Sequence, residues 1–410
     1  MTTSPKPRLV LFDHDGGIDD LLSLTMLLAM PHLELSGIIV TPADCFLRPA
    51  VSASLKVLRF FDRLDIDLCE GTLYGVNPFP RAWRAHAYAV DALPILNELK
   101  PVQPLEDTPP PVVLPGSRLE SPLTGNPLQD MEQRLRAKLM TELDLSPGGV
   151  TTDVGEHSLQ ALYDRSLRHE NIVLSRTEKN QLFRRLVHQI LSRRAGVLPV
   201  PSAEPGHEFI ARKLREATQP VTVLITGPVT NLATALATEP ELAAMVEEVV
   251  WMGGALQVPG NVSDYEHDGS AEWNAYWDPP ATHSLWQSGV PLTLFSLDAT
   301  NNVPVTLDFL HRLAQQRRHP LSDLAGQCWA LTVGTLPAYE YTYHMWDTLT
   351  TGYLGGAQFM TFREARTEAI PYGPSAGRIK EVTEGGKLIK VAEQVDVEGF
   401  HNYLLELFRR

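Results

Sequence analysis

The sequence predicts an α/β fold in which an open, mainly parallel, doubly wound sheet is flanked by helices and carries a helical insertion. Over the first hundred residues, short apolar runs suited to buried parallel strands alternate with segments of helical spacing. The same alternation returns after about residue 205. Between about residues 101 and 205 it stops, and we therefore expect one domain over residues 1–410 with a largely helical insert inside it.

The first hundred residues hold three expected strands and two expected helices. The apolar run RLVLF reads as a buried strand, and the helix behind it stops at Pro31, because proline cannot continue a helix. Two further strands and a second helix follow in the same rhythm. The expected strands cover residues 8–12, 33–41 and 66–71, and the expected helices cover residues 19–31 and 52–64.

The insert opens with a Pro-rich stretch, residues 101–116, where regular structure is disfavoured. Two polar, amphipathic helices are expected behind it, over residues 121–143 and 175–196. The second is rich in arginine, so it either covers a partner or subunit interface or presents a solvated face.

The strand and helix pattern resumes with a β-branched strand, a Gly-Pro turn and a helix within residues 220–236. We expect Thr230 or Asn231 to cap that helix. A Gly-rich stretch at residues 248–256 and a polar loop lead to another strand within residues 291–300. The last helix, residues 397–410, ends in basic residues, which suits a helix C-terminus.

Composition excludes several function classes. The 35 basic and 49 acidic residues give a formal charge of −14, which argues against nucleic acid or an anionic membrane as partner and favours a small neutral or cationic ligand. Cys45, Cys69 and Cys328 are widely spaced with no CxxC, so we expect reduced, buried thiols. The N-terminus lacks a signal-peptide apolar region and no apolar run reaches the roughly 18 residues of a membrane span, so we expect a cytoplasmic protein.

An acidic turn directly follows the first strand. Four carboxylates fall within eight positions, at the strand's carboxyl end and the start of the next helix, where open α/β sheets bind ligands. A helix N-terminus favours negative charge by about 0.3–1 kcal/mol, which accounts for one of them. The others require protonation, solvent exposure or a hard divalent cation such as Ca²⁺, around which Gly16 and Gly17 allow the backbone to bend. The four residues are Asp13, Asp15, Asp19 and Asp20.

Two families begin with a strand and an Asp-x-Asp turn. The stretch FDHDGG is similar to the turn of haloacid dehalogenase-type phosphoryl-transfer enzymes, but Gly17 stands where that family has Thr or Val. Residues 13–20 resemble the Asp-x-Asp-x-Gly-x-Asp-Asp opening of the nucleoside hydrolases at every fixed position. Further elements of that family follow in order: GIIVTPAD, TGPVTNL, WMGGAL, GN, AEWNAYWDP, LDAT and HMWDTL. The resemblance covers roughly residues 8–100 and 205–410.

The resemblance implies a nucleoside hydrolase-like fold and hydrolysis of the N-glycosidic bond of a ribonucleoside by a Ca²⁺-bound water. It implies that Asp15, Asp20, Asp347 and the carbonyl of Thr226 ligate Ca²⁺, with the ribose hydroxyls completing the shell. Asp15 would also accept the proton of the water. Asp19 would hold the 2′-hydroxyl, and Asp13 would support the loop from behind.

The same resemblance assigns residues to the sugar. Asn261, Glu272 and Asn274 match the side chains that hold the 3′- and 5′-hydroxyls, since amides and carboxylates together offer donors and acceptors to a polyol. Met252 is expected to pack beside the sugar. Asp44 stands where the family usually has Asn.

The leaving-group side departs from the family pattern. Known members carry a His directly before the late calcium-binding Asp, where this chain has Trp346, whose indole does not titrate but can stack on a base and exclude water. His344 is the alternative acid, on the same face as Trp346 in an extended segment and on another face in a helix.

Residues 77–98 lie where other members carry a His-Gly-x-Asp-Gly loop, and Asp91 is the expected match to that Asp. Trp83, Arg84, His86 and Tyr88 are expected to line the base pocket. The resemblance leaves the preferred base open.

Ribonucleoside hydrolysis is therefore the leading hypothesis, with a small-molecule nucleoside substrate and a homodimer or homotetramer as the implied assembly. A calcium-dependent nucleoside-binding protein with weak or no turnover is the first alternative, because Trp346 replaces the acid. A haloacid dehalogenase-type phosphatase, which would form an aspartyl-phosphate on Asp13, is the second.

Overall fold

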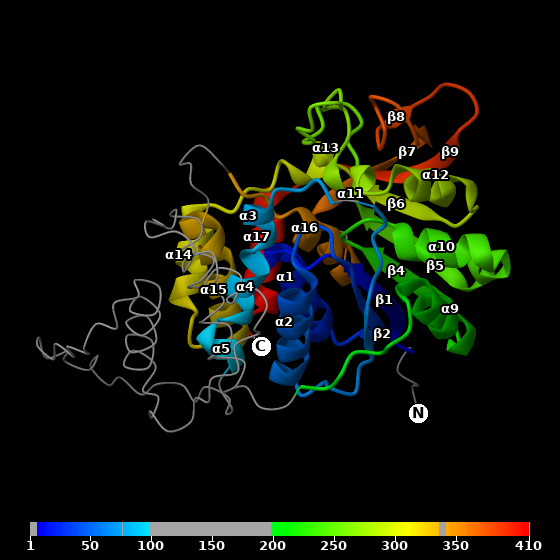
Figure 1. Cartoon of the computed structure of the whole chain (residues 1–410). Helices are drawn as coiled ribbons and strands as arrows, with labels where there is room; N and C mark the ends of the chain where they lie inside the picture. The colour runs from blue at the N-terminus through cyan, green and yellow to red at the C-terminus, as the bar shows by residue number, and fades with distance from the viewer. Residues whose placement is uncertain (1–5, 76, 98–197, 336–341, 357, 410) are drawn as a thin grey trace, which may run out of the picture. The chain divides into compact units, whose positions relative to one another are not determined.

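The computed structural model describes residues 6–75, 77–97, 198–335, 342–356 and 358–409 (Figure 1). The chain divides into two compact units, Met1–Leu96 with Val197–Arg410, and Asn97–Gly196. The two helices expected in the insert lie outside the described residues, so the single-domain assignment stays a prediction. The fold described below is that of the first unit.

A nine-stranded sheet, in the order β3-β2-β1-β4-β5-β6-β9-β7-β8, forms the centre of this unit as the structure describes it. The seven strands from β3 to β9 in that order pair in parallel, and β7 runs antiparallel to both β9 and β8. The strands are β1 (Arg8–His14), β2 (Leu33–Val40), β3 (Leu68–Glu70), β4 (Val221–Ile225), β5 (Val246–Met252), β6 (Leu292–Phe295), β7 (Met360–Ala369), β8 (Ile379–Glu381) and β9 (Lys387–Val395).

Helices cover both faces of the sheet (Figure 1). They are α1 (Ile18–Ala29), α2 (Leu47–Phe60), α3 (Arg81–Arg84), α4 (His86–Asp91), α5 (Pro94–Asn97), α9 (Gly206–Glu216), α10 (Thr230–Thr238), α11 (Trp273–Tyr276), α12 (Pro279–Gln287), α13 (Leu297–Thr300), α14 (Leu307–Gln315), α15 (Pro320–Thr335), α16 (Trp346–Gly352) and α17 (Val397–Leu407), with 3-10 turns η2 (Pro240–Met245) and η3 (Tyr353–Gly355).

Strand alternation divides the apolar core between the two faces. Val10 and Phe12 of β1 belong to a buried cluster with residues of α1, α2, α15, α16 and α17. Leu11, between them, belongs to a second cluster with residues of α9, α10 and α12. Successive side chains of a strand point to opposite faces, so both faces of a central strand must be apolar. This explains the uninterrupted run RLVLF.

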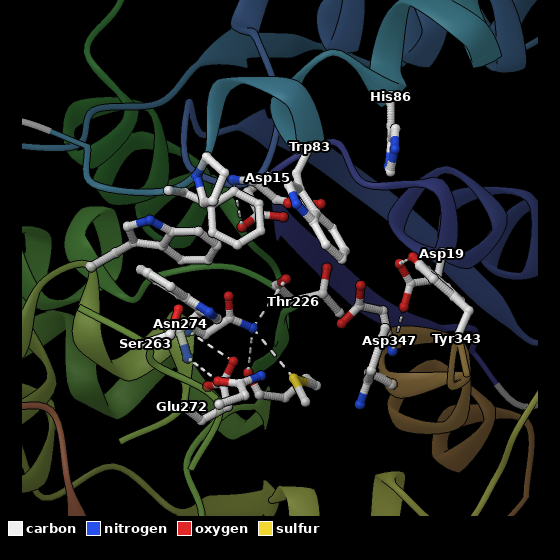
Figure 2. A pocket seen from close by; sticks show the side chains of 18 residues that line it. Asp15, Asp19, Trp83, His86, Thr226, Ser263, Glu272, Asn274, Tyr343 and Asp347 are labelled. Atoms are coloured by element: carbon white, nitrogen blue, oxygen red, sulfur yellow. Dashed lines mark hydrogen bonds between the residues drawn. The ribbon is translucent and has the colours of Figure 1, made fainter. Parts of the chain in front are cut away.

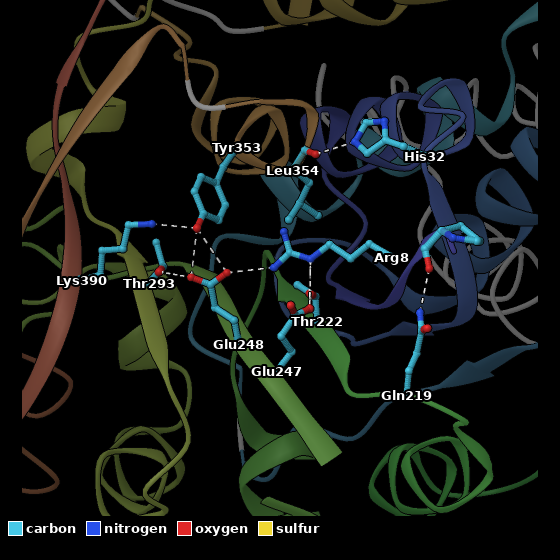
Figure 3. Close-up of polar contacts among 11 residues, drawn as sticks. Arg8, His32, Gln219, Thr222, Glu247, Glu248, Thr293, Tyr353, Leu354 and Lys390 are labelled. Atoms are coloured by element: carbon cyan, nitrogen blue, oxygen red, sulfur yellow. Dashed lines mark hydrogen bonds and ion pairs between the residues drawn. The ribbon is translucent and has the colours of Figure 1, made fainter. Parts of the chain in front are cut away.

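A polar network crosses the sheet near the amino-terminal ends of β1 and β5 (Figure 3). The Arg8 guanidinium donates to the Thr222 hydroxyl at 2.6 Å and to the Glu248 carboxylate at 3.1 Å. Tyr353 donates to the same carboxylate at 3.1 Å, and Lys390 donates to the Tyr353 hydroxyl at 2.8 Å. The carboxylate of Glu248 therefore has a cation and a hydroxyl as partners.

The expected α/β class, the mainly parallel sheet and its flanking helices are confirmed. The expectation that Thr230 or Asn231 caps its helix is wrong, since Val229 occupies the N-cap without a side-chain bond. The two side chains bond elsewhere: Thr230 donates to Asp278 at 2.7 Å and Asn231 to Asp13 at 3.0 Å. The strands β7, β8 and β9 have no counterpart among the expected strands, because charged residues such as Arg363 and Glu381 pair across this exposed end of the sheet instead of forming apolar runs.

The three cysteines are free and buried, as expected. Within the described ranges, none of the helices combines the length and the apolar character needed to cross a bilayer.

Candidate active site

The strand order reverses between β1 and β4. These strands are parallel neighbours, with Val10 opposite Thr222, although the chain continues from β1 to β2 on one side and from β4 to β5 on the other. The Thr226 N–H donates to the Asp13 carbonyl at 2.9 Å, which joins the two strand ends. In open α/β sheets, such a reversal leaves a crevice at the carboxyl ends of the strands, where ligands bind.

A pocket of about 320 Å³ opens at this crevice (Figure 2). Its lining includes most of the expected catalytic, metal-binding and substrate-binding residues, and the exceptions are Asp20, Arg84, Tyr88 and His344. Figure 2 shows Asp19, Tyr343 and Asp347 on one side and Ser263, Glu272 and Asn274 on another. The lining residues are Asp15, Asp19, Asp44, Phe79, Pro80, Trp83, His86, Thr226, Met252, Asn261, Ser263, Glu272, Trp273, Asn274, Trp277, Tyr343, Trp346 and Asp347.

A carboxylate cluster, consisting of Asp15, Asp19, Asp20 and Asp347, forms one wall. Carboxylate oxygens of Asp19, Asp20 and Asp347 lie within 4.8 Å of one another, close enough to share one ion. Asp15 shares a side-chain hydrogen bond with Asp20. All four residues are at least 94% buried, since the most exposed, Asp347, has an exposed fraction of 6%.

Backbone and hydroxyl groups fix the orientation of these carboxylates. The Gly17 N–H donates to Asp20 at 2.6 Å, and the Thr226 hydroxyl donates to the other oxygen of Asp20. Tyr343 donates its phenolic proton to Asp19 at 2.5 Å, and the Asp347 N–H donates to the second oxygen of Asp19 at 3.3 Å. The start of α1 and the start of α16 are thereby joined through Asp19.

The carboxylate cluster concentrates acidic groups in one buried place. Burial, together with the charge of the neighbouring carboxylates, raises the pKa of Asp15 and of Asp347 well above the usual range, and burial raises the pKa of Asp20 to about 7. Among the described residues that line the pocket there is no Lys or Arg, whereas Glu248 has Arg8 as its partner. Buried oxygen donors with uncompensated charge fit a hard divalent cation.

Asp13 supports the site from beneath and does not line the pocket. It accepts hydrogen bonds from the Thr41 hydroxyl at 2.8 Å and from the Asn231 amide at 3.0 Å. Burial raises the pKa of Asp13 to about 7 although these bonds counteract the effect. Its backbone carbonyl receives the Thr226 N–H, so this buried residue holds the ends of β1, β2 and β4 together.

Amide and carboxylate groups form the next part of the wall. The Glu272 carboxylate accepts from the N–H groups of Gly254 and Asn274, each at 2.9 Å, and burial raises the pKa of Glu272 to about 7. The Asn274 amide donates to the carbonyls of Met252, at 3.0 Å, and Thr226, at 3.4 Å.

Asn261 and Asp44 complete the polar part of the lining. The Asn261 side-chain oxygen accepts from the Trp273 N–H at 3.1 Å, so its NH₂ group is the part that can serve a ligand. The Asp44 N–H donates to the Asp15 carboxylate at 3.3 Å. Burial and the charges of Asp20 and Asp19 raise the pKa of Asp44, and the Arg84 guanidinium counteracts this.

The opposite side is an aromatic wall, consisting of Phe79, Trp83, Trp273 and Trp277. Phe79 is its centre, with ring centroids 5.0 Å from Trp273, 5.3 Å from Trp277 and 6.3 Å from Trp83. Edge-to-face packing of this kind holds large rings in fixed positions. His86 lies next to the wall, 6.1 Å from the Trp83 ring.

Trp346 and Tyr343 line the pocket beside the carboxylate cluster. Their rings pack edge to face at 4.8 Å, and the Trp346 indole donates to the Asn301 side chain at 2.9 Å. His344 lies between them in the sequence but does not line the pocket. It pairs with Pro304 in an isolated bridge, and alternation along this extended segment brings Tyr343 to the pocket instead.

Other expected base-pocket residues also lie outside the lining. Arg84 stacks on the Phe46 ring at 4.8 Å, and Tyr88 lies 5.9 Å from the same ring. Asp91 is fully buried and forms an ion pair with Lys56 at 2.8 Å, between α2 and α4.

Six lining residues are not predicted by the sequence, namely Tyr343, Ser263, Phe79, Pro80, Trp273 and Trp277. Of these residues, only Tyr343 could have been predicted. It lies four residues before Asp347, and an extended segment there can bring its side chain to the pocket.

The fold and the pocket define an α/β protein of the nucleoside hydrolase class. The chain belongs to the inosine-uridine preferring nucleoside hydrolase family, whose model matches residues 10–402. The resemblance found in the sequence is thereby confirmed, and the phosphatase alternative is not retained.

Known relatives match in sequence and in structure. The chain is 30% identical to the inosine-uridine preferring nucleoside hydrolase of Bacillus anthracis, with a TM-score of 0.70 over 98% of this chain and 99% of that one. It is 32% identical over 185 residues, 42% of this chain, to the pyrimidine-specific ribonucleoside hydrolase RihA of a Shewanella species. That match spans 56% of the relative, about half its length. A plant nucleoside hydrolase, at 19% identity and a TM-score of 0.62 over 98% of this chain and 99% of that one, shares the fold.

Proposed function

We propose that the protein hydrolyses the N-glycosidic bond of a ribonucleoside to ribose and free base, with Ca²⁺ at the carboxylate cluster. The observation that carries this proposal is the placing of the cluster, the Glu272 and Asn274 pair and the aromatic wall around one pocket. Hydrolysis of a nucleoside needs three features in one pocket: a polar site for the sugar, a group that activates water at the sugar carbon, and an apolar surface for the base.

Asp15, Asp20, Asp347 and the Thr226 carbonyl would hold the ion. Ca²⁺ takes six to eight oxygen ligands, so this set leaves positions for water and for sugar hydroxyls. When bound, the ion supplies a Lewis acid that orients hydroxyl oxygens and makes a water molecule more acidic. Asp19 lies within the same group of oxygens. Tyr343 and the Asp347 N–H fix the two oxygens of Asp19, and in this proposal Asp19 accepts a further hydrogen bond from the ribose 2′-hydroxyl.

Asp15 serves as the general base in this proposal. It lines the pocket, and its carboxylate accepts the Asp44 N–H at 3.3 Å; in this proposal the same carboxylate accepts the proton of the attacking water. A positioned carboxylate that removes a proton from the attacking water contributes about 10²–10⁴-fold to a rate.

The sugar lies against Asn261, Glu272 and Asn274. Glu272 is already fixed by two N–H groups, so its carboxylate is in place before the substrate arrives. Hydrogen bonds from the 3′- and 5′-hydroxyls to these groups then set the sugar carbon in front of Asp15.

The base lies against the aromatic wall and Trp346. Neither Trp83 nor Trp346 can donate a titrating proton, so they act by stacking on the base and excluding water from it. His86, whose ring lies 6.1 Å from that of Trp83, is a titratable side chain at the margin of the wall. We give His344 no part in the reaction.

Release of reducing sugar from a panel of purine, pyrimidine and modified ribonucleosides, with Ca²⁺ and with a chelator, tests the proposal. We expect release that stops with the chelator and returns when Ca²⁺, but not Mg²⁺, is added in excess. Release that is unchanged by the chelator would contradict the calcium role. No release from any nucleoside would contradict hydrolysis.

One observation favours a second candidate, a calcium-dependent nucleoside-binding protein without turnover. The position before Asp347 holds Trp346, and the nearby His344 does not line the pocket. Isothermal titration separates the two candidates: heat of nucleoside binding that requires Ca²⁺, with no sugar released, would support the binding protein.

We also propose a homodimer or homotetramer, as the family resemblance implies. Light scattering of the purified full chain tests it, and a mass of one chain would contradict it.

A further inference from the structure

One side-chain amide joins the segment before Asp44, whose N–H contacts Asp15 of the carboxylate cluster, to the aromatic wall. Asn77 lies in the loop before α3 and uses its whole hydrogen-bonding capacity. Its NH₂ group donates to the carbonyls of Pro42, at 3.1 Å, and Ala43, at 2.7 Å. Its oxygen accepts from the Phe79 N–H, at 2.9 Å, and from the Trp277 indole N–H, at 3.1 Å.

Each of these partners leads to a pocket residue. Pro42 and Ala43 directly precede Asp44, whose N–H contacts the Asp15 carboxylate. Phe79 and Trp277 are members of the aromatic wall. Trp277 lies 200 positions from Asn77 in the sequence. Asn77 therefore links two parts of the pocket. Its bonds to Pro42 and Ala43 lead through Asp44 to the Asp15 carboxylate, and its bonds to Phe79 and Trp277 lead to the aromatic wall.

The amide is the chemical group that this position requires. A carboxylate of the same shape could still accept from Phe79 and Trp277, but it would turn two lone pairs toward two carbonyl oxygens. Alanine would leave the indole N–H of Trp277 and the two carbonyls without this partner. Residues 77–80 lie outside any helix or strand, so the Asn77 bonds are a main restraint on the course of this loop.

We propose that Asn77 is a positioning residue that fixes the distance and angle between the aromatic wall and the carboxylate cluster. This inference rests on the proposed function. It adds that Asn77, which contacts no substrate, sets the position of the aromatic wall that binds the departing base. A misplacement of about 1 Å between reacting groups can cost a factor of about 100. Loss of the Asn77 bonds should therefore affect departure of the base more than reactions at the sugar.

Two substrates separate these effects. One is the best ribonucleoside of the panel, whose base departs with difficulty and needs the wall. The other is p-nitrophenyl β-D-ribofuranoside, whose leaving group departs as a stable anion and needs only the sugar site. For Asn77→Asp we expect kcat/KM to fall about tenfold or more with the nucleoside, and by less than about threefold with the nitrophenyl riboside.

Asn302→Asp is the matched control. Asn302 also donates its amide to two carbonyls, of Asp298 at 2.6 Å and Ala299 at 3.3 Å, but it is exposed and does not line the pocket. We expect this variant to behave as the wild type with both substrates. Thermal unfolding of all variants shows whether a loss of activity follows from loss of the fold.

Equal losses with the two substrates, or no loss with either, would overturn the inference. Near-ultraviolet circular dichroism adds a readout that does not need turnover, since the Trp277 indole loses its fixed partner in Asn77→Ala. We expect a changed tryptophan signal in Asn77→Ala and an unchanged one in Asn302→Ala. If the wild type released no sugar from either substrate, the proposed function would fail, whereas the dichroism would still decide whether Asn77 positions the wall.

Discussion

The two main walls of the pocket are built by different means. The carboxylate cluster comes from the ends of regular elements, with Asp15 after β1, Asp19 and Asp20 in the first turn of α1, and Asp347 in the first turn of α16. The aromatic wall comes from the loop before α3, from α3 itself and from the short helix α11 with the residue after it. Backbone hydrogen bonds of the sheet place the first wall. Ring packing and the Asn77 side chain place the second.

The difference teaches where chemistry and selectivity reside. Main-chain geometry changes little when side chains are replaced, so under the proposed function we expect the cluster to carry out the same reaction on every substrate. The position of the aromatic wall depends on a few side chains, so replacements can change which base is accepted while the reaction stays the same. Changes in the cluster should then act equally on all nucleosides, and changes in the wall unequally.

The largest effect is expected from Asp15→Asn, which keeps the shape of the side chain but removes the proton acceptor. We expect kcat to fall about 10³-fold with every nucleoside of the panel. Sugar release under saturating Ca²⁺ measures it. Asp65→Asn, which removes an exposed carboxylate paired with Arg63 at 2.9 Å, is the control and should retain full activity. If the loss of kcat in Asp15→Asn differed tenfold between bases, the cluster would not act equally on all nucleosides, and the distinction between the two walls would be wrong.

The next effect concerns stability and pH. Because burial raises the pKa of Glu272 to about 7, the folded protein retains a proton there that the unfolded chain releases near pH 4.5. Without metal, the free energy of unfolding should therefore fall as pH rises from 4.5 to 7, with up to about 3 kcal/mol from this residue. Urea unfolding in chelator at several pH values measures the slope. Glu272→Gln should flatten it, and an identical slope in the variant would show that Glu272 ionises normally.

A smaller effect is expected from Trp83→Leu. Stacking of a base on an aromatic ring contributes about 1–3 kcal/mol, so kcat/KM should fall about tenfold or more. The loss should be greater for purines, which offer the larger surface, than for pyrimidines. Steady-state kinetics with one nucleoside of each kind measures the difference. Equal losses for both bases would mean that the wall does not select the base.

The smallest effect is expected from His344→Asn. His344 does not line the pocket, and burial lowers its pKa, so the neutral ring predominates near pH 7. We expect kcat to change by less than about threefold, where loss of a general acid would cost about 100-fold. The pH dependence of kcat in both proteins provides the check. A basic limb that disappears in the variant would restore His344 as the acid.

The same division explains how much of the protein the sequence predicts. The order of strands, turns and helices and the spacing of Asp13, Asp15 and Asp20 suffice to predict the fold and the position of the acidic turn. The reason is that strand ends in a parallel sheet meet at one edge. Residues 272–274 join the site for the same reason, since they follow the loop after β5.

The aromatic wall was harder to predict. Trp83 and His86 were expected there, but so were Arg84 and Tyr88, which pack on Phe46 instead. Short helices turn neighbouring side chains to opposite faces, and one residue of register decides which of them reaches the pocket. Tyr343 was missed for the same reason, because the choice between it and His344 depends on the pairing of His344 with Pro304, about 40 positions away.

The pairing of β1 with β4 has a consequence for synthesis of the chain on the ribosome. β1 ends at His14, but its partner β4 begins only at Val221, and residues 98–197 must be made in between. One edge of β1 therefore stays unpaired with β4 while translation continues at about 5–20 residues per second. The crevice between the two strands, and with it the complete active site, is assembled only late in the life of the nascent chain.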